Sequence, residues 1–211
     1  MTENLIREQI TELGKSLYDR GLAHGSAGNI SVKLGDGGFL LTPTNSCLGR
    51  LDPAKISRLD GNGKLVSGDA PSKEAFLHLA MYQERAKSAA VVHLHSLHAV
   101  AVSCLADVDA ADVFPPITAY AIMQVGKLAL FSYYPPGDQA LADAVRKLAG
   151  KHHAVLLANH GPVVAGTSLA AAVNAIEELE QTARLMLLLQ GRPTRLLTAG
   201  QVAELNRRFP S

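Results

Sequence analysis

The sequence predicts an α/β protein of three layers (α-β-α), with a mostly antiparallel or mixed sheet lying between helices. Apolar residues recur at helical spacing over 3–20 and over 168–189. Short apolar runs elsewhere are bounded by glycine-rich turns, as at 36–38 and 60–63, which is typical of hairpins. Frequent hairpins argue against a doubly wound parallel sheet, whose strands alternate with helices.

The first half of the chain is expected to contain two helices and several short strands. Gly21 is suited to ending the first helix, and Ser72 is suited to capping the second. The expected elements are, in order, a helix over 3–20, strands over 29–32 and 39–41, short strands on either side of 60–63, and a helix over 72–86.

The second half is expected to alternate strands with helices. The expected elements are a strand over 89–95, a helix near 97–106, two strands within 117–131, a helix over 138–148, strands over 154–158 and 163–166, and helices over 168–189 and 198–208. The apolar run 185–189 is far shorter than the roughly 20 residues that cross a bilayer. We interpret it as a buried helix end.

Length and charge limit the classes of protein to consider. The chain has 211 residues and a formal net charge of +1, which suits a single domain over 1–211. Near-neutral charge argues against nucleic acid as a partner. No apolar leader or membrane-spanning run is present, and two cysteines give no disulfide framework. We therefore expect a cytoplasmic protein with no membrane partner.

Two histidines close one apolar run, and a third closes another. His93 and His95 lie two residues apart, so in a strand both side chains point to the same face. His160 follows the apolar residues 154–158. Three protein ligands with one open position are typical of catalytic rather than structural zinc. Glu74 could supply a fourth ligand or act as an acid/base.

Less specific interpretations of these residues also exist. His93 and His95 could be core residues, although two imidazoles buried on one face would still need hydrogen-bond partners. Glu74 alone could be a first-turn glutamate favoured by the helix dipole. His78 lies one helical turn after Glu74, and we expect it and His98 to serve in the core or to support the ligands.

Small hydrogen-bond donors gather in three segments, 26–29, 42–46 and 72–73. They could form a phosphate nest from backbone N–H groups, hydroxyls, a helix N-terminus and Lys73. Plain turn chemistry explains the same composition equally well. The GxxxxGK[ST] signature is absent, so a nucleotide is not the expected ligand.

Together these residues resemble the class II aldolase/adducin-head family over nearly the whole chain. The motifs that carry the resemblance are Gly28-Asn29-Ile30-Ser31, Thr42-Pro43-Thr44, Pro71-Ser72-x-Glu74, His93-x-His95 and Asn159-His160-Gly161. The resemblance implies a class II aldolase-like fold and one Zn²⁺ per chain, with Mn²⁺ or Co²⁺ as alternative ions. It implies His93, His95, His160 and Glu74 as metal ligands, with Glu74 also catalytic. The residues it places at the substrate phosphate are Gly28, Asn29, Thr44, Asn45, Ser72 and Lys73.

The resemblance also implies a substrate class and an assembly. Asn45 and Lys73 depart from the aldolase pattern and look like the branch that decarboxylates 3-oxo-tetronate 4-phosphate. The implied reaction gives dihydroxyacetone phosphate and carbon dioxide through a metal-stabilised enediolate. A fuculose-phosphate-type aldolase or a pentulose-phosphate 4-epimerase is the alternative, and a non-enzymatic adducin-type binding module is a third. The expected partners are a small phosphorylated sugar acid and other copies of the chain, in a homotetramer where Tyr120 acts catalytically in the neighbouring site.

Overall fold

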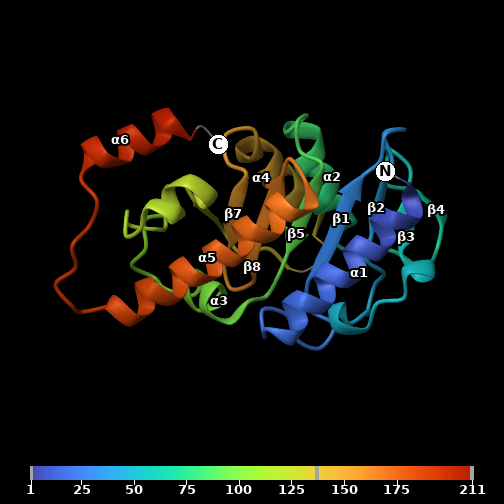
Figure 1. Ribbon diagram of the computed structural model, residues 1–211, viewed down its shortest axis with the longest axis horizontal. Coiled ribbons are helices and arrows are strands. Elements are labelled where there is room, and N and C mark those ends of the chain that lie inside the picture. The colour runs from blue at the N-terminus through green and yellow to red at the C-terminus, as the bar shows by residue number, and fades with distance from the viewer. Residues whose placement is uncertain (1, 136–137, 210–211) are drawn as a thin grey trace.

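Eight strands form one sheet in the computed structural model, which describes residues 2–135 and 138–209 (Figure 1). Their order across the sheet is β4-β3-β2-β1-β5-β8-β7-β6. Neighbouring strands are antiparallel except β6 and β7, which are parallel. The strands are β1 (Asn29–Lys33), β2 (Phe39–Leu41), β3 (Ser57–Leu59), β4 (Leu65–Ser67), β5 (Ala90–His93), β6 (Ala129–Phe131), β7 (Ala154–Leu157) and β8 (Gly161–Gly166).

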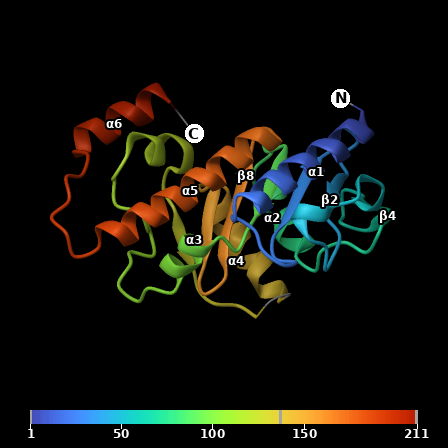
Figure 2. The ribbon, with the colours of Figure 1, turned by 60° about the horizontal axis from the view of Figure 1, so that its bottom comes forward.

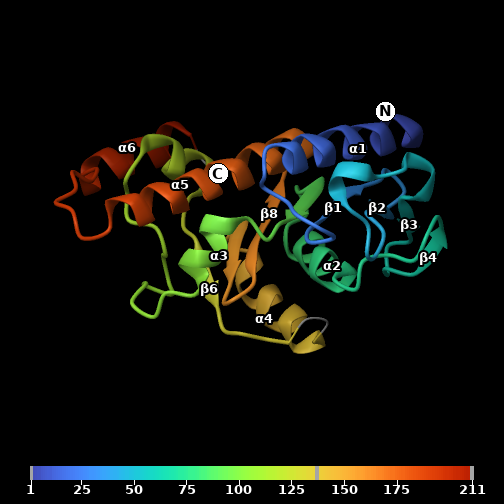
Figure 3. The same ribbon diagram turned by 90° about the horizontal axis from the view of Figure 1, so that it is seen from below.

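Helices cover both faces of this sheet, which confirms the three-layer prediction (Figure 3). The helices are α1 (Glu3–Asp19), α2 (Ala75–Glu84), α3 (Leu97–Ser103), α4 (Gln139–Ala149), α5 (Leu169–Leu189) and α6 (Ala199–Arg208), with short helices η1 (Leu48–Arg50), η2 (Pro53–Lys55) and the π-helical η3 (Ala121–Val125). Helices α1, α3 and α5 pack on one face, and α2 and α4 pack on the other.

Alternation along the strands divides the core between the two faces. Ile30 and Val92 pack toward α1 and α5, whereas Phe39 and Val91 pack toward α2 and α4. Successive side chains of a strand point to opposite faces, so a sheet covered twice is apolar along its whole length. This explains why β5, β7 and β8 consist almost entirely of apolar residues.

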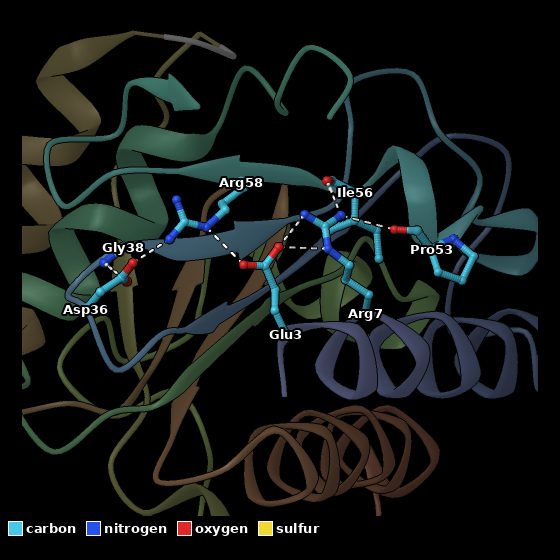
Figure 4. Close-up of polar contacts among 7 residues, drawn as sticks. All are labelled: Glu3, Arg7, Asp36, Gly38, Pro53, Ile56 and Arg58. Carbon is cyan, nitrogen blue, oxygen red and sulfur yellow. Dashed lines mark hydrogen bonds and ion pairs between the residues drawn. The ribbon is translucent and has the colours of Figure 1, made fainter. Parts of the chain in front are cut away.

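A buried arginine of α1 forms hydrogen bonds with the segment that leads into β3 (Figure 4). Arg7 donates to Ile56 O at 2.6 Å and to Pro53 O at 3.1 Å, and Glu3 accepts from both Arg7 and Arg58. Arg7 is only 8% exposed, and its charge is matched by that of Glu3. Hydrogen bonds to a charged donor stabilise more than neutral ones, so this contact fixes the position of α1.

The C-terminal helix lies at the far end of the molecule from β4 (Figure 1, Figure 2). A capping box between Thr198 and Gln201 starts α6. Helix α6 contacts η3 and has no buried residue. None of the helices formed by the described residues combines the length and apolar character that crossing a bilayer requires.

Three details of the sequence-based expectation were wrong. Helix α2 begins after Glu74, and Ser72 does not cap it but accepts from Glu74 N within the preceding turn. Part of 117–131 forms the π-helical η3 instead of a strand, and only β6 is extended there. The run 185–189 is not a buried helix end, because Leu185 and Leu188 are 36% and 61% exposed in the single chain.

Candidate metal centre and active site

His93 ends β5 with its ring orientation fixed by the next strand. Its Nδ1 donates to Pro162 O at 2.8 Å, because a carbonyl oxygen can only accept. The neutral ring then carries no proton on Nε2. That atom lies 3.1 Å from His95 Nε2 and 3.3 Å from His160 Nε2. Pinning one ring nitrogen to a carbonyl is how proteins orient histidine ligands of metals.

His95 and His160 lie near His93 Nε2 because the two turns that carry them pack closely against each other. His95 lies just beyond β5, and His160 lies in the turn between β7 and β8. Gly161 has φ +152°, and a Cβ there would stand 2.3 Å from Leu94 O. Only glycine permits this approach, so Gly161 allows the turn to bring the third imidazole to the other two.

Glu74 closes the group from the start of α2. Its Oε1 lies 3.2 Å from His160 Nε2 and its Oε2 lies 3.5 Å from His93 Nε2. One ligand atom from each of the four residues falls within 4.8 Å of all the others. A tetrahedral zinc with ligand bonds of about 2.0 Å has ligand atoms about 3.3 Å apart. The donor set and its spacing therefore fit a divalent ion.

Burial and charge set the protonation states that a metal requires. Burial lowers the pKa of His93 and lowers that of His95 to about 3, so both rings are neutral near pH 7. Burial alone would raise the pKa of Glu74, but His93, His160 and Asn29 outweigh it, and the net shift is downward. Neutral imidazoles and an ionised carboxylate are the forms that bind metal.

Two residues expected at the phosphate lie against Glu74. Asn29 Nδ2 donates to Glu74 Oε2 at 2.7 Å and to Ser72 Oγ at 3.2 Å. Gly28 has φ +85°, and a Cβ there would stand 2.9 Å from His93 O. The strand pairing sets Asn29 directly opposite His93, which explains why the first motif adjoins the metal ligands.

Comparisons with known proteins agree with this geometry. Residues 8–187 match the model of the Class II Aldolase and Adducin N-terminal domain family. The chain belongs to this family. It is 50% identical over 203 residues to 3-oxo-tetronate 4-phosphate decarboxylase of Escherichia coli K12, covering 96% of each chain.

More distant and structural relatives give the same family. The chain is 34% identical over 182 residues to L-fuculose phosphate aldolase of Methanocaldococcus jannaschii, covering 86% of this chain and 96% of that protein. The crystal structure of YgbL from Escherichia coli superposes with a TM-score of 0.95 at 49% identity, covering 96% of this chain and 98% of that one. The fold class predicted from the sequence is thereby confirmed.

In this member of the class II aldolase and adducin family, a second pair of candidate residues lines a cavity of about 390 Å³. Thr44 and Asn45 form part of its wall, together with Arg50 and Lys55. Lys73 is exposed and does not line this cavity. An isolated bridge between residues 43 and 71 joins the loop that carries Thr44 to the one that carries Lys73.

Tyr120 was expected to act in a neighbouring site. It precedes η3, and its side chain is 63% exposed in the single chain. An exposed tyrosine that precedes a helix packed on α5 and α6 is available to a neighbouring molecule. The single chain assigns it no catalytic contact.

Some contributors to the site were missed by the sequence-based interpretation. Pro162 O orients His93, yet a backbone carbonyl leaves no mark in the sequence beyond the neighbouring His160-Gly161 pair. Arg50 and Lys55 line the cavity of Thr44, where Asp52 and Asp69 balance their charge. Arg50 lies five residues after Asn45, which departs from the aldolase pattern, and this proximity is the one signal that could have indicated it.

Proposed function

We propose that this chain is a metal-dependent carboxy-lyase that converts 3-oxo-tetronate 4-phosphate to dihydroxyacetone phosphate and carbon dioxide. The observation that carries the proposal is 50% identity to a decarboxylase of that name over 96% of both chains. The converging Glu74 and three imidazoles support it, because this branch of chemistry needs a centre that stabilises negative charge.

We further propose zinc as the resident ion, one per chain. His93, His95, His160 and Glu74 would hold it, since three imidazoles and a carboxylate are a zinc donor set. Mn²⁺ and Co²⁺ are alternatives because they accept the same ligands. When bound, the ion supplies Lewis acidity that stabilises negative charge developing on substrate oxygen.

The reaction breaks the bond between C1 and C2 of the substrate. Carbon dioxide leaves, the electron pair moves toward the C3 carbonyl oxygen as an enediolate forms, and C2 then takes up one proton. No base is needed to begin, but a proton donor is needed to finish. The chain must therefore hold the substrate, keep the carboxylate end free to leave, and deliver a proton to C2.

Glu74 is the residue best placed to deliver this proton. Two opposing influences act on its pKa: burial raises it, whereas contact with His93 and His160 lowers it. A carboxylate that moves away from the imidazoles loses the lowering influence and keeps the burial, so its affinity for a proton rises. The same side chain can thus be an ionised ligand at rest and an acid during turnover. Tyr120 of a neighbouring subunit is the other candidate donor.

The phosphate end is assigned to the loops before α2 and after β2. Ser72 Oγ accepts from Glu74 N, and Lys73, between these two residues, is exposed. Thr44 and Asn45 line the cavity joined to these residues by the bridge between 43 and 71. Holding the phosphate at a fixed distance from Glu74 would position C2 and C3 for reaction.

An aldolase is the second candidate. Identity of 34% to L-fuculose phosphate aldolase favours it, because cleavage of a sugar phosphate passes through the same enediolate. A pentulose-phosphate 4-epimerase has no equivalent support among the residues. A non-enzymatic binding module would have no need of four converging ligand atoms.

We also propose that residues 1–211 act as one domain, in a homotetramer with sites at subunit boundaries, in the cytoplasm. Leu188 and Leu196 are 61% and 44% exposed near the end of α5, and Tyr120 is exposed as well. Apolar surface of this kind is typical of contacts between protein molecules.

A substrate panel tests the activity. The purified, metal-loaded chain is offered both C2 epimers of 3-oxo-tetronate 4-phosphate, their unphosphorylated forms, and fuculose and ribulose phosphates. We expect carbon dioxide and dihydroxyacetone phosphate in equal amounts from a phosphorylated oxo-acid. Aldehyde release from fuculose phosphate without decarboxylation would instead establish the aldolase.

A further inference from the structure

Four buried polar side chains lie behind Glu74. One is Asn29, which is expected at the substrate phosphate, and neither metal binding nor substrate binding accounts for the other three. His78 and Ser31 are fully buried, and Asn29 and Tyr82 are 4% and 6% exposed. Burying such groups costs free energy unless each finds a partner. Here every one of them does.

Their contacts form a single chain from the core to the metal centre. Tyr82 Oη lies 2.7 Å from Ser31 Oγ, which lies 2.7 Å from His78 Nδ1. His78 Nε2 lies 2.5 Å from Asn29 Oδ1, and Asn29 Nδ2 lies 2.7 Å from Glu74 Oε2.

These groups align because four residues of a helix and two residues of a strand advance by nearly the same distance. Four residues separate each member of the series Glu74, His78 and Tyr82, which begins at the N-cap of α2 and continues along the helix. Each step of four residues advances about 6 Å along a helix. Asn29 and Ser31 are spaced two apart along β1, and that step advances about 6.7 Å. The two stripes therefore stay in register, and polar groups of α2 meet polar groups of β1.

Chemistry fixes the direction of every hydrogen bond in this chain. The Glu74 carboxylate only accepts, so Asn29 must turn its NH₂ toward it and its carbonyl toward His78. His78 must then carry its proton on Nε2, which leaves Nδ1 to accept from Ser31. Ser31 in turn accepts from Tyr82. Burial lowers the pKa of His78 to about 3, in keeping with a neutral ring.

We propose that His78 is a positioning residue that, backed by Ser31 and Tyr82, locks the amide of Asn29 in the one orientation that donates to Glu74. The inference rests on the proposed function only in treating Glu74 as a metal ligand and acid. Without a donor at position 78, the Asn29 amide can turn over and present its oxygen to the carboxylate. Two acceptors then face each other, and Glu74 rotates away from the imidazoles.

A matched pair of substitutions isolates the donor from the packing. His78→Gln keeps an N–H that can reach Asn29 Oδ1, whereas His78→Met has similar volume and no donor. Each variant is loaded with Co²⁺, and affinity and the visible spectrum are measured beside kcat and KM. Loss of an outer hydrogen-bond partner commonly weakens metal affinity or activity about 10- to 100-fold, which is the loss expected for His78→Met.

The expected pattern is specific to positioning. His78→Met should lower Co²⁺ affinity, change the cobalt spectrum and reduce kcat with KM little altered, whereas His78→Gln should recover most of each. Melting temperatures of the metal-free variants control for folding. Equal losses in both variants, tracking equal losses of melting temperature, would show that position 78 only fills the core. Wild-type behaviour of His78→Met would equally refute the proposal.

A second measurement tests the directions of these hydrogen bonds and needs neither metal nor substrate. Nitrogen-15 NMR of histidine-labelled protein distinguishes the two neutral tautomers, and the His78→Gln spectrum identifies the signal among the eight histidines. We expect the Nε2–H tautomer of His78. The Nδ1–H tautomer would reverse the directions of the hydrogen bonds from Tyr82 to Asn29 and would overturn the inference. If the wild-type protein bound no divalent ion, the proposed function would fail, while this tautomer measurement would still decide the role of His78.

Discussion

Asn29 Nδ2 lies 2.7 Å from Glu74 Oε2, so a side chain expected at the substrate phosphate contacts the residue expected at the metal. The same NH₂ group also reaches Ser72 Oγ at 3.2 Å. Asn29 therefore stands between the metal ligands and the loop assigned to the phosphate. A phosphate bound at that loop would be separated from Glu74 by one amide group.

Removing one imidazole should remove the metal. His95→Ala is the variant of choice because His95 is only partly buried, whereas His93 is fully buried and its loss would also disturb β5. We expect metal content by mass spectrometry to fall from one ion per chain to a trace, with loss of turnover. His98→Gln is the control, since His98 contacts Glu180 and lies outside the cluster. A His95→Ala protein with a full complement of zinc would show that the ligand assignment is wrong.

Replacing the carboxylate of Glu74 should separate binding from chemistry. Glu74→Gln keeps the shape and can still accept from Asn29, but it cannot deliver a proton. We expect turnover to fall about a hundredfold or more, the usual scale for a general acid/base, with the fold and most substrate binding retained. Glu84→Gln, at the exposed end of the same helix, should act like the wild type. Near-normal rates for Glu74→Gln would reduce Glu74 to a charge at the start of α2.

Lys73 should distinguish phosphorylated from unphosphorylated substrates. It is exposed beside the start of α2, where its charge adds to the positive end of the helix. Lys73→Ala should raise KM for the phosphorylated oxo-acid far more than for its unphosphorylated analogue. Arg50→Ala is the comparison, because Arg50 lines the cavity of Thr44. A larger phosphate-specific loss in Arg50→Ala would move the phosphate into that cavity.

Stripping the metal should lower both activity and stability. Without a cation, three imidazole nitrogens, from one buried and two partly buried rings, and a carboxylate face one another within 4.8 Å. A ligand at a hundred times its dissociation constant stabilises the folded state by about 2.7 kcal/mol. We therefore expect chelator to abolish turnover and lower the melting temperature, and added Zn²⁺ to restore both. The melting temperature of His95→Ala should not respond to either treatment.

Mixing two inactive variants tests whether sites are shared. If Tyr120 completes the site of a neighbour, hybrids of His95→Ala and Tyr120→Phe chains contain some boundaries with every group intact. Part of the activity should return, and sedimentation should report a tetramer. A fully active monomer at assay concentration would refute the shared site. Confirmed hybrids without activity would remove only Tyr120 from it.

The sequence predicts those parts of the fold that local chemistry determines. Helix α1 follows from its apolar spacing and from Gly21, which adopts φ +76° directly after it. The hairpin at 36–38 follows from Asp36 and its glycines, since Asp36 Oδ1 accepts from Gly38 N. These features depend on neighbours in sequence, so a local pattern records them.

Other features depend on residues that are distant in the sequence. Ile122 and Val125 favour a strand by propensity, yet packing against α5 and α6 holds this segment as the π-helical η3. Likewise, the three histidines and Glu74 can be identified from their motifs, but the contact between Asn29 and Glu74 arises from strand pairing. No local sequence pattern encodes whether the oxygen or the NH₂ group of the Asn29 amide contacts a given partner.

The bridge between Pro43 and Pro71 has a consequence for how this scaffold diversifies. It joins the loop that carries Thr44 to the loop that carries Lys73, whereas the four converging ligands lie at the end of β5, just before α2 and in the turn before β8. A phosphate held by these two loops would separate substrate recognition from the reactive centre along the chain, except at Ser72, which contacts Glu74. Exchange of the two loops with Ser72 retained would then change the phosphate ester that is bound and leave the contacts of Ser72 with Asn29 and Glu74 in place. Libraries confined to 42–46, 71 and 73 are the economical starting point for such redesign.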